Sequence, residues 1–244
     1  NLHSGLDFYH GRMWKVADAD DTHVTFEMDS PDGDQGYPGA LVMKVTYSLD
    51  EENTLMIHYE AEPDQDTIIN MTNHSYFNLN GHKSGDVLNH TLWLNADAFT
   101  PADAASIPTG EIRSVEGTPM DFRTDKTIGK DIGADYEPLV FGNGYDHNWV
   151  LKNEGEFDKV AEVAGDESGI HMSVLTDLPG VQIYTANFLD GVKGRDGAVY
   201  EMRDAICLET QYYPDAIHHE NFPGPICKKG EKYDTRTAYR FRVK

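Results

Sequence analysis

The feature that most limits the possible folds is the alternation of apolar and polar residues in short segments. Over residues 41–49 the apolar side chains fall at every second position, and residues 50–53 are turn formers. Residues 55–60 then begin a second segment of the same kind. Because a period of two places successive side chains on opposite faces of a strand, this region predicts a β-hairpin.

The same pattern recurs along the chain, while helical periodicity is nearly absent. We expect a second hairpin at residues 160–176 and a short helix only at residues 125–132, with residues 99–120 irregular. Short strands separated by turns are typical of an all-β fold, here a large antiparallel β-sandwich in a single domain spanning residues 1–244. Further strands are expected at residues 24–28, 91–95, 142–151, 181–189, 205–211 and 239–243.

Charge and composition exclude several classes of partner. The net charge of −22 over 244 residues would repel nucleic acid and disfavours a multiply phosphorylated substrate, but it does not penalise a neutral ligand. No apolar run approaches the roughly 20 residues of a membrane span, so we expect no membrane contact. The two cysteines, Cys207 and Cys227, form no metal-binding pattern, and two free thiols favour a reducing, cytoplasmic location.

One stretch carries an unusual concentration of polar groups. Residues 70–81, NMTNHSYFNLNG, are predicted to form a strand that stops at an Asn-Gly turn. Alternation would place Asn70, Thr72, His74 and Tyr76 on one face. A row of amide, hydroxyl, imidazole and phenol groups could recognise and protonate a small polyhydroxylated ligand, although a solvated sheet face with a hydrogen-bonded histidine explains the same pattern.

Four further residues are candidates for a site. Glu209 stands in an otherwise apolar strand, where it is either an acid at a sheet edge or a partly desolvated general base with a raised pKa. Asp146 follows a Gly-Tyr turn and could cap that turn or line a site. Gln182 follows Pro-Gly in a strand, and His3 lies among small residues that let a backbone approach a ligand.

Other common chemistries lack their sequence signals. His3, His74, Asp146 and Glu209 are ligand types, but they come from distant segments without an HxH or HExxH pair, so we expect no metal site. The absence of a GxSxG elbow argues against a serine hydrolase. No glycine-rich nucleotide motif is present, and no cofactor is expected.

Ordered motifs along nearly the whole chain resemble one family. The motifs are NLHSG, SPDGDQGYPGAL, NMTNHSYFNLNG, IPTGEI, NGYDHNW, PGVQIYTANFLDG and ICLETQYYPDAIHH. Together they resemble the aldose 1-epimerase (galactose mutarotase) family. The resemblance implies the β-supersandwich fold of that family, with a sugar held in a cleft over one large sheet. It also implies interconversion of the α and β anomers of a free hexose, such as galactose or glucose, without a metal or organic cofactor.

The resemblance assigns a role to each candidate residue. Glu209, in LETQ, matches the family's catalytic base, and His74, in TNHSYF, matches its general acid. His3, in LHSG, stands where the family has LHGG, whose histidine orients the sugar. Asp146, in GYDHN, and Gln182, in PGVQIYT, match positions that bind the sugar or line its site.

The sequence departs from the family pattern at its start. Family members carry a further N-terminal region with a GRVANRI-type motif, whose arginine contacts the sugar, and this chain begins at the LHSG segment. We therefore expect an N-terminally incomplete form with exposed sheet edges and a reduced activity. Two alternatives stay open: a carbohydrate-binding domain without catalysis, and a hexose-phosphate epimerase. In each case the partner is a monosaccharide, and the protein is a monomer or a homodimer.

Overall fold

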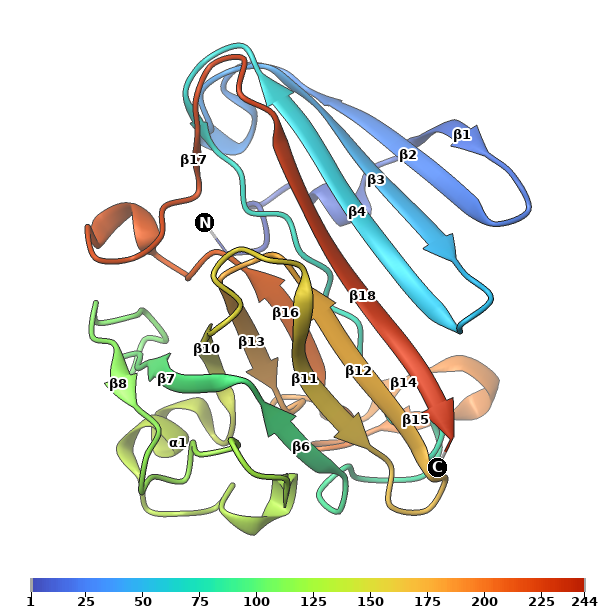
Figure 1. Cartoon of the computed structure of the whole chain (residues 1–244), viewed down its shortest axis with the longest axis vertical. Coiled ribbons are helices and arrows are strands. Elements are labelled where there is room, and N and C mark those ends of the chain that lie inside the picture. Colours follow the sequence, from blue (N-terminus) through green and yellow to red (C-terminus); the bar gives the residue numbers. More distant parts are fainter. Residues whose placement is uncertain (1, 244) are drawn as a thin grey trace.

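Two antiparallel sheets make up most of the structure, a computed structural model that describes residues 2–243. Residues 1 and 244, the ends of the predicted domain, lie outside the described residues. The larger sheet forms the long curved layer of Figure 1. Its nine strands follow the order β1 (Lys15–Ala19), β2 (His23–Ser30), β3 (Leu41–Leu49), β4 (Thr54–Pro63), β18 (Tyr233–Val243), β12 (Ile170–Thr176), β11 (Asp158–Ala164), β6 (Thr91–Leu94) and β9 (Lys126–Thr127).

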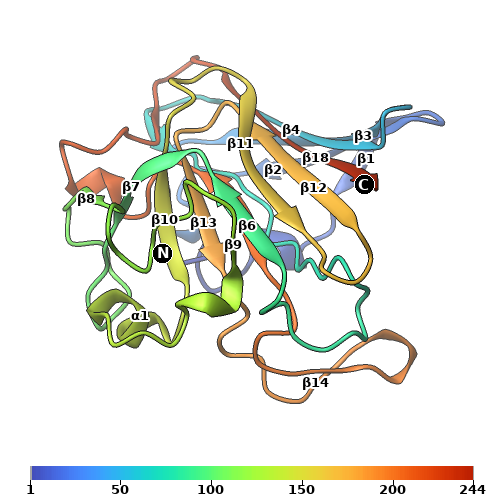
Figure 2. The same ribbon diagram turned by 60° about the horizontal axis from the view of Figure 1, so that its bottom comes forward.

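The smaller sheet lies beside β11 and β12 and carries the candidate site (Figure 1). Its order is β16 (Cys207–Gln211), β13 (Gly180–Tyr184), β10 (Asp146–Leu151), β7 (Ala96–Thr100) and β8 (Arg113–Ser114). Two short ladders join β14 (Val192–Lys193) to β15 (Val199–Tyr200), and β17 (Ile226–Cys227) to β5 (Thr67–Ile68). The first of these belongs to a long loop that projects from the rest of the molecule in Figure 2.

Helices are few and short. The described residues contain one α-helix, α1 (Glu137–Gly142), at the end of the smaller sheet. No helix within residues 2–243 has the length and apolar character needed to cross a membrane. The 3-10 turns are η1 (Tyr9–Gly11), η2 (Asp34–Gly36), η3 (Ile128–Lys130), η4 (Arg195–Gly197) and η5 (Ala216–His218).

A continuous hydrophobic core lies between the two sheets. Trp149 and Ile183 of the smaller sheet and Met172 and Tyr239 of the larger one are buried in the same cluster. Burial of such large side chains contributes about 1.5–3 kcal/mol each to folding. The predicted all-β, antiparallel sandwich is therefore confirmed, whereas the single-domain assignment stays a prediction.

The predicted hairpin at residues 41–60 forms β3 and β4. Its turn is held by Asp50, whose carboxylate accepts hydrogen bonds from the backbone N–H groups of Glu52 and Thr54. Asn53 adopts the left-handed conformation, with φ 57°, that this residue type tolerates well. Both local signals in the sequence thus agree with the register of the long strands. The second hairpin, β11 with β12, also forms as expected.

Three expectations on secondary structure were wrong. Residues 125–132 form β9 and a 3-10 turn instead of a helix, because Ile128 and Gly129 donate their N–H groups to the backbone of residues 88–90. Helix α1 was not foreseen. The strand expected at residues 181–189 ends at Tyr184, and two residues later Ala186 has a φ of 51°, which breaks an extended ladder.

The central stretch at residues 70–81 is also not the regular strand that its alternation predicted. It runs along the open edge of β16 and makes one backbone bridge there, between Phe77 and Ile206. At its other end the side-chain amide of Asn70 pairs with the backbone of Tyr212. The alternation of sides survives nonetheless, because Asn73 and Phe77 contact core tyrosines while His74 turns toward Glu209.

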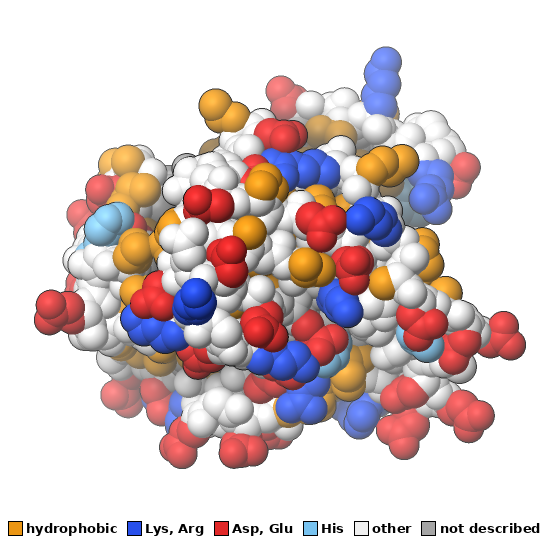
Figure 3. Space-filling view, turned by 90° about the horizontal axis from the view of Figure 1, so that it is seen from above, with side chains coloured by type: hydrophobic (Ala, Val, Ile, Leu, Met, Phe, Trp, Pro, Cys, Tyr) orange, Lys and Arg blue, Asp and Glu red, His pale blue; other side chains and the backbone are white. Residues whose placement is uncertain are grey.

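Charged side chains of both signs are interspersed on the surface. Figure 3 shows acidic and basic groups mixed over one face of the molecule. Many of the ion pairs are exposed, as between Lys15 and Asp29 or Lys228 and Asp66. Such pairs contribute at most about 1 kcal/mol each, so the core and the two sheets hold the fold together.

Candidate active site

A polar row crosses the outer face of the smaller sheet. Strand register places Asn148 of β10, Gln182 of β13 and Glu209 of β16 directly opposite one another. Neighbouring residues along the strands, such as Trp149 and Leu208, point the other way into the core. One face of these three strands is therefore core and the other is a polar surface.

Side-chain amides tie this row together. Gln182 Nε2 donates a hydrogen bond of 2.8 Å to Asp146 Oδ1. Gln211 Nε2 in turn lies 3.3 Å from Gln182 Oε1 and 3.4 Å from Asn148 Oδ1. The carboxylate of Asp146 is thereby fixed at one end of the row, while Glu209 accepts none of these bonds and stays available.

The turn that enters β10 depends on a glycine. Gly144 has a φ of 126°, and a Cβ added there would lie 2.5 Å from Arg203 Nη1. Arg203 occupies that space and donates hydrogen bonds to the carbonyl of Asn143 and the side chains of Thr185 and Asn187. These contacts join the ends of β10 and β13 to the loop that leads into β16.

Glu209 and His74 meet at the edge of the row. His74 Nε2 lies 3.6 Å from Glu209 Oε1, which is a contact distance longer than a good hydrogen bond. The side chain of Glu209 is 10% exposed and that of His74 is 31% exposed, so the acid is sheltered while the imidazole reaches solvent. A hydroxyl of a small ligand could contact both groups at once.

Burial changes the proton affinity of each of these groups. Loss of hydration, with the nearby charge of Asp146, raises the pKa of Glu209 to about 8. Burial also raises the pKa of Asp146, although the hydrogen bond from Gln182 opposes that rise. For His74, burial lowers the pKa, and the neighbouring His3 and His10 act in the same direction. At 3.6 Å the Glu209–His74 contact does not outweigh this burial.

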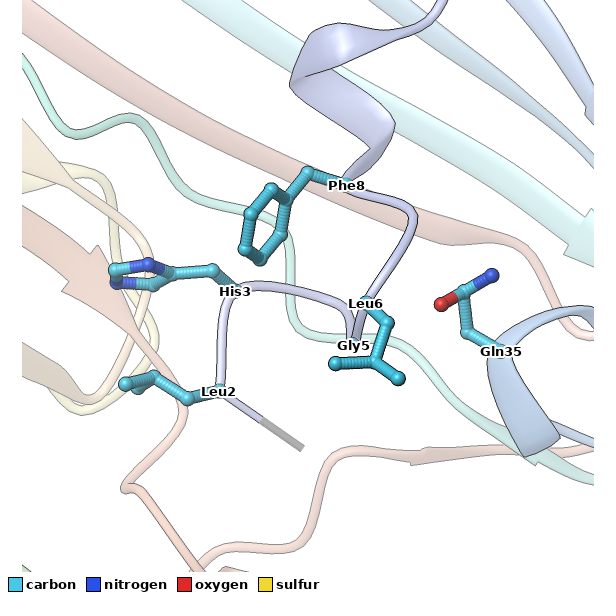
Figure 4. Close-up of a pocket in the computed structure, with 6 residues that line it drawn as sticks. All are labelled: Leu2, His3, Gly5, Leu6, Phe8 and Gln35. Carbon is cyan, nitrogen blue, oxygen red and sulfur yellow. The ribbon is translucent and has the colours of Figure 1, made fainter.

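His3 reaches the site from the N-terminal loop. Its φ of 52° and that of Ser4, 70°, belong to a left-handed turn completed by Gly5. The imidazole lies edge-on to His74, with ring centroids 5.5 Å apart. Figure 4 shows it directed away from Leu6 and Gln35, with which it lines an open hollow of about 550 Å³. His3 therefore stands between that hollow and the polar row.

Aromatic rings surround His74 on its remaining sides. Tyr76 stacks on the imidazole at 5.0 Å, and Tyr184 meets it edge-on at 5.7 Å. Phe188, exposed, stacks in turn on Tyr184. Such rings orient a neighbouring side chain and offer apolar faces to a ligand.

All five residues predicted from the sequence come together here. Glu209 contacts His74, Asp146 is bonded to Gln182, and His3 packs on His74. Sequence reasoning missed other members, because they are selected by strand register, which periodicity does not give. Those members are Asn148, Tyr184, Phe188 and the clamp residue Arg203.

A cluster suited to a metal ion lies elsewhere among the described residues. His58, Glu60 and Asp234, on the larger sheet, each offer one ligand atom within 4.8 Å of the others. Lys232 Nζ already bridges the two carboxylates, at 2.7 Å from Glu60 and 2.9 Å from Asp234. The chemistry of the polar row is therefore that of carboxylate, imidazole and amide groups.

Comparison with known proteins identifies the family. The family model described as aldose 1-epimerase matches residues 1–240. The chain belongs to the aldose 1-epimerase family. Among relatives of this family, it is 43% identical to galactose mutarotase from Bos taurus, over 100% of this chain and 69% of that protein. It is 38% identical to aldose 1-epimerase from Escherichia coli K12, over 98% of this chain and 70% of that protein.

Solved structures of aldose 1-epimerases have the same fold. An aldose epimerase homologue from C. elegans superposes with a TM-score of 0.89 at 31% identity, covering 99% of this chain and 72% of that one. Galactose 1-epimerase from Lactobacillus acidophilus gives a TM-score of 0.82 at 29% identity, covering 95% of this chain and 67% of that one. The fold implied by the motifs is thus confirmed.

Proposed function

We propose that this member of the aldose 1-epimerase family interconverts the α and β anomers of a free hexose, galactose or glucose, by acid–base ring opening and closure. The observation that carries the proposal is the contact of a buried carboxylate, Glu209, with a partly exposed imidazole, His74, beside a row of amides. Family membership supports the reaction class. Asp146, Gln182 and His3 are proposed to bind the sugar hydroxyls.

The reaction needs two proton transfers at neighbouring oxygens. Glu209 takes the proton of the anomeric hydroxyl, the bond between the anomeric carbon and the ring oxygen breaks, and its electron pair stays on the ring oxygen. His74 gives that oxygen a proton, which leaves an open-chain aldehyde. Rotation about the bond to the carbonyl carbon presents its other face, and the two transfers then run in reverse. Each well-placed transfer contributes about 10²–10⁴-fold to the rate.

The pair must hold a single proton to start this cycle. With the pKa of Glu209 raised to about 8 and that of His74 lowered, the proton of the free pair resides mainly on Glu209 at neutral pH. Moving it to His74 gives the carboxylate base and imidazolium acid without changing the total charge of the pair. The proposed mechanism therefore predicts activity wherever the pair carries one proton.

Polarimetry with freshly dissolved α-galactose or α-glucose tests the function. We expect the protein to accelerate mutarotation, and Glu209→Gln to lower the rate by about 100-fold or more. Glu62→Gln, an exposed acid on the larger sheet, is the matched control and should leave the rate unchanged. Sugar binding in calorimetry without any rate enhancement would instead favour a binding domain, and a preference for glucose 6-phosphate would favour a hexose-phosphate epimerase.

Further properties follow as part of this proposal. The partner is a neutral monosaccharide, and the protein acts as a monomer or a homodimer. The buried, free thiols of Cys207 and Cys227 support a cytoplasmic location. The reduced rate expected without an N-terminal arginine stays a prediction, which the same rate measurement addresses.

A further inference from the structure

One buried hydroxyl lies between the segment that carries His74 and the strand that carries Glu209. Tyr239 of β18 is 1% exposed, and its hydroxyl is 3.1 Å from Oδ1 of Asn73 and 2.9 Å from the carbonyl oxygen of Leu208. Asn73 immediately precedes His74, and the Leu208 carbonyl belongs to the peptide bond that joins Leu208 to Glu209. One side chain thus contacts the backbone or side chain next to each member of the pair.

The position of this hydroxyl fills a gap in the sheet edge. The bridge of Phe77 with Ile206 shows that the backbone groups of Ile206 face the open edge of β16. Backbone groups two residues apart in a strand face the same edge, so the Leu208 carbonyl faces it too. The segment carrying His74 leaves the edge before it reaches Leu208, and the Tyr239 hydroxyl supplies the donor in its place.

The ring of Tyr239 is itself held firmly. It packs against Phe77 at a centroid distance of 4.9 Å, inside the core between the sheets. Its single hydroxyl proton is shared between the two acceptors, Asn73 and Leu208. Turning the Asn73 amide over would let that amide donate to Tyr239 instead, and both contacts persist in either orientation. The link between segment and strand therefore does not depend on which way the amide points.

We propose that Tyr239 is a positioning residue that sets the separation of His74 and Glu209. The inference rests on the proposed function, in which both groups must reach one hemiacetal. A displacement of about 1 Å between reacting groups can cost about 100-fold in rate. Tyr239 acts from inside the core, behind the sheet face that carries the polar row, through Asn73 on one side and Leu208 on the other.

The test compares two tyrosine substitutions on the same strand. Tyr239→Phe keeps the ring and removes the bridging hydroxyl. Tyr233→Phe removes a hydroxyl that is also buried, and that accepts the N–H of Met71 at 3.2 Å instead of bonding to the backbone of β16. We expect Tyr239→Phe to lower kcat by about tenfold or more with KM within about threefold, and Tyr233→Phe to keep kcat within about twofold. Equal losses of kcat in both variants would overturn the proposal.

A double substitution examines the bridge from its other end. Asn73→Ser also breaks the contact with Tyr239, so Asn73→Ser combined with Tyr239→Phe should lose no more kcat than the more damaging single variant. Multiplying effects would show that the two residues act independently, against the proposal.

A second readout does not require turnover. Proton NMR titration of the His74 imidazole should move toward the ordinary pKa of histidine in Tyr239→Phe, because a loosened segment is better hydrated, and should not move in Tyr233→Phe. If the wild-type protein fails to accelerate mutarotation, the proposed function fails, and this titration alone decides the inference: no movement in Tyr239→Phe overturns it. Neither substitution changes the groups that face His74, namely His3, His10, Tyr76, Tyr184 and Glu209.

Discussion

Glu209 shows how far a single residue can be interpreted before its neighbours are known. A charged residue in an apolar strand allowed two interpretations, an edge acid or a desolvated base, and the burial of Glu209 agrees with the second. The resemblance in the LETQ motif pointed the same way. What the sequence could not predict is the approach of Asp146, whose charge adds to the rise in the pKa of Glu209. That approach depends on register across β10, β13 and β16.

The raised pKa of Glu209 has a consequence for stability. Because its folded-state pKa of about 8 exceeds the unfolded value of 4.5, the folded protein binds the extra proton, and this stabilisation is complete below pH 4.5 and is lost as the pH rises through 8. A pKa difference of one between the two states corresponds to about 1.4 kcal/mol. Glu209→Gln should therefore gain stability relative to the wild type between pH 5 and pH 8.5, measured by urea unfolding. A constant difference across that range would contradict the burial of a titrating carboxyl group.

The same pair should shape the dependence of rate on pH. The mechanism needs one proton on Glu209 and His74 together, so kcat/KM should fall above about pH 8, where Glu209 loses its proton. On the acid side it should fall only below the ordinary pKa of histidine, because the pKa of His74 is lowered. Polarimetry over pH 5–9 measures both limits. A rate that continues to rise beyond pH 9 would exclude Glu209 as the titrating group.

At the scale of the element, alternation predicted the regular strands and failed where long-range contacts decide. Residues 41–49 and 170–176 became β3 and β12 as expected, since their pattern and turns agree. Residues 70–81 alternate equally well, yet side chains such as Asn70 replace the ladder there. Helix α1 is too short for helical periodicity to show. Local pattern therefore predicted the sides that side chains take, and tertiary contacts decided which backbones pair.

The turn into β10 provides a test at this scale. Gly144→Ala would force a side chain into a left-handed position already filled by Arg203, and we expect a loss of about 1–3 kcal/mol in unfolding free energy. Sugar affinity should also fall, because Asp146 follows this turn. Gly133→Ala, where a Cβ meets nothing within 4 Å, is the control and should change neither quantity. Thermal unfolding and calorimetry measure the two effects, and an unchanged Gly144→Ala would refute the proposed clamp.

For the whole molecule, the net charge of −22 acts on charged ligands without affecting neutral ones. A neutral hexose should be processed with a kcat/KM that changes by less than about twofold between roughly 20 mM and 500 mM salt. A phosphorylated hexose, repelled at low salt, should be a poorer substrate that improves as salt is added. Steady-state polarimetry at several salt concentrations tests this expectation. A preference for the phosphorylated sugar at low salt would contradict it.

The central claim is that Glu209 and His74 converge on one hemiacetal, and a crystal structure with a bound hexose tests it most directly. We expect the Glu209 carboxylate within about 3 Å of the anomeric oxygen and His74 Nε2 within about 3 Å of the ring oxygen. Asp146 and Gln182 should contact other hydroxyls of the same sugar. A hexose bound with either Glu209 or His74 out of reach of its anomeric centre would contradict the claim.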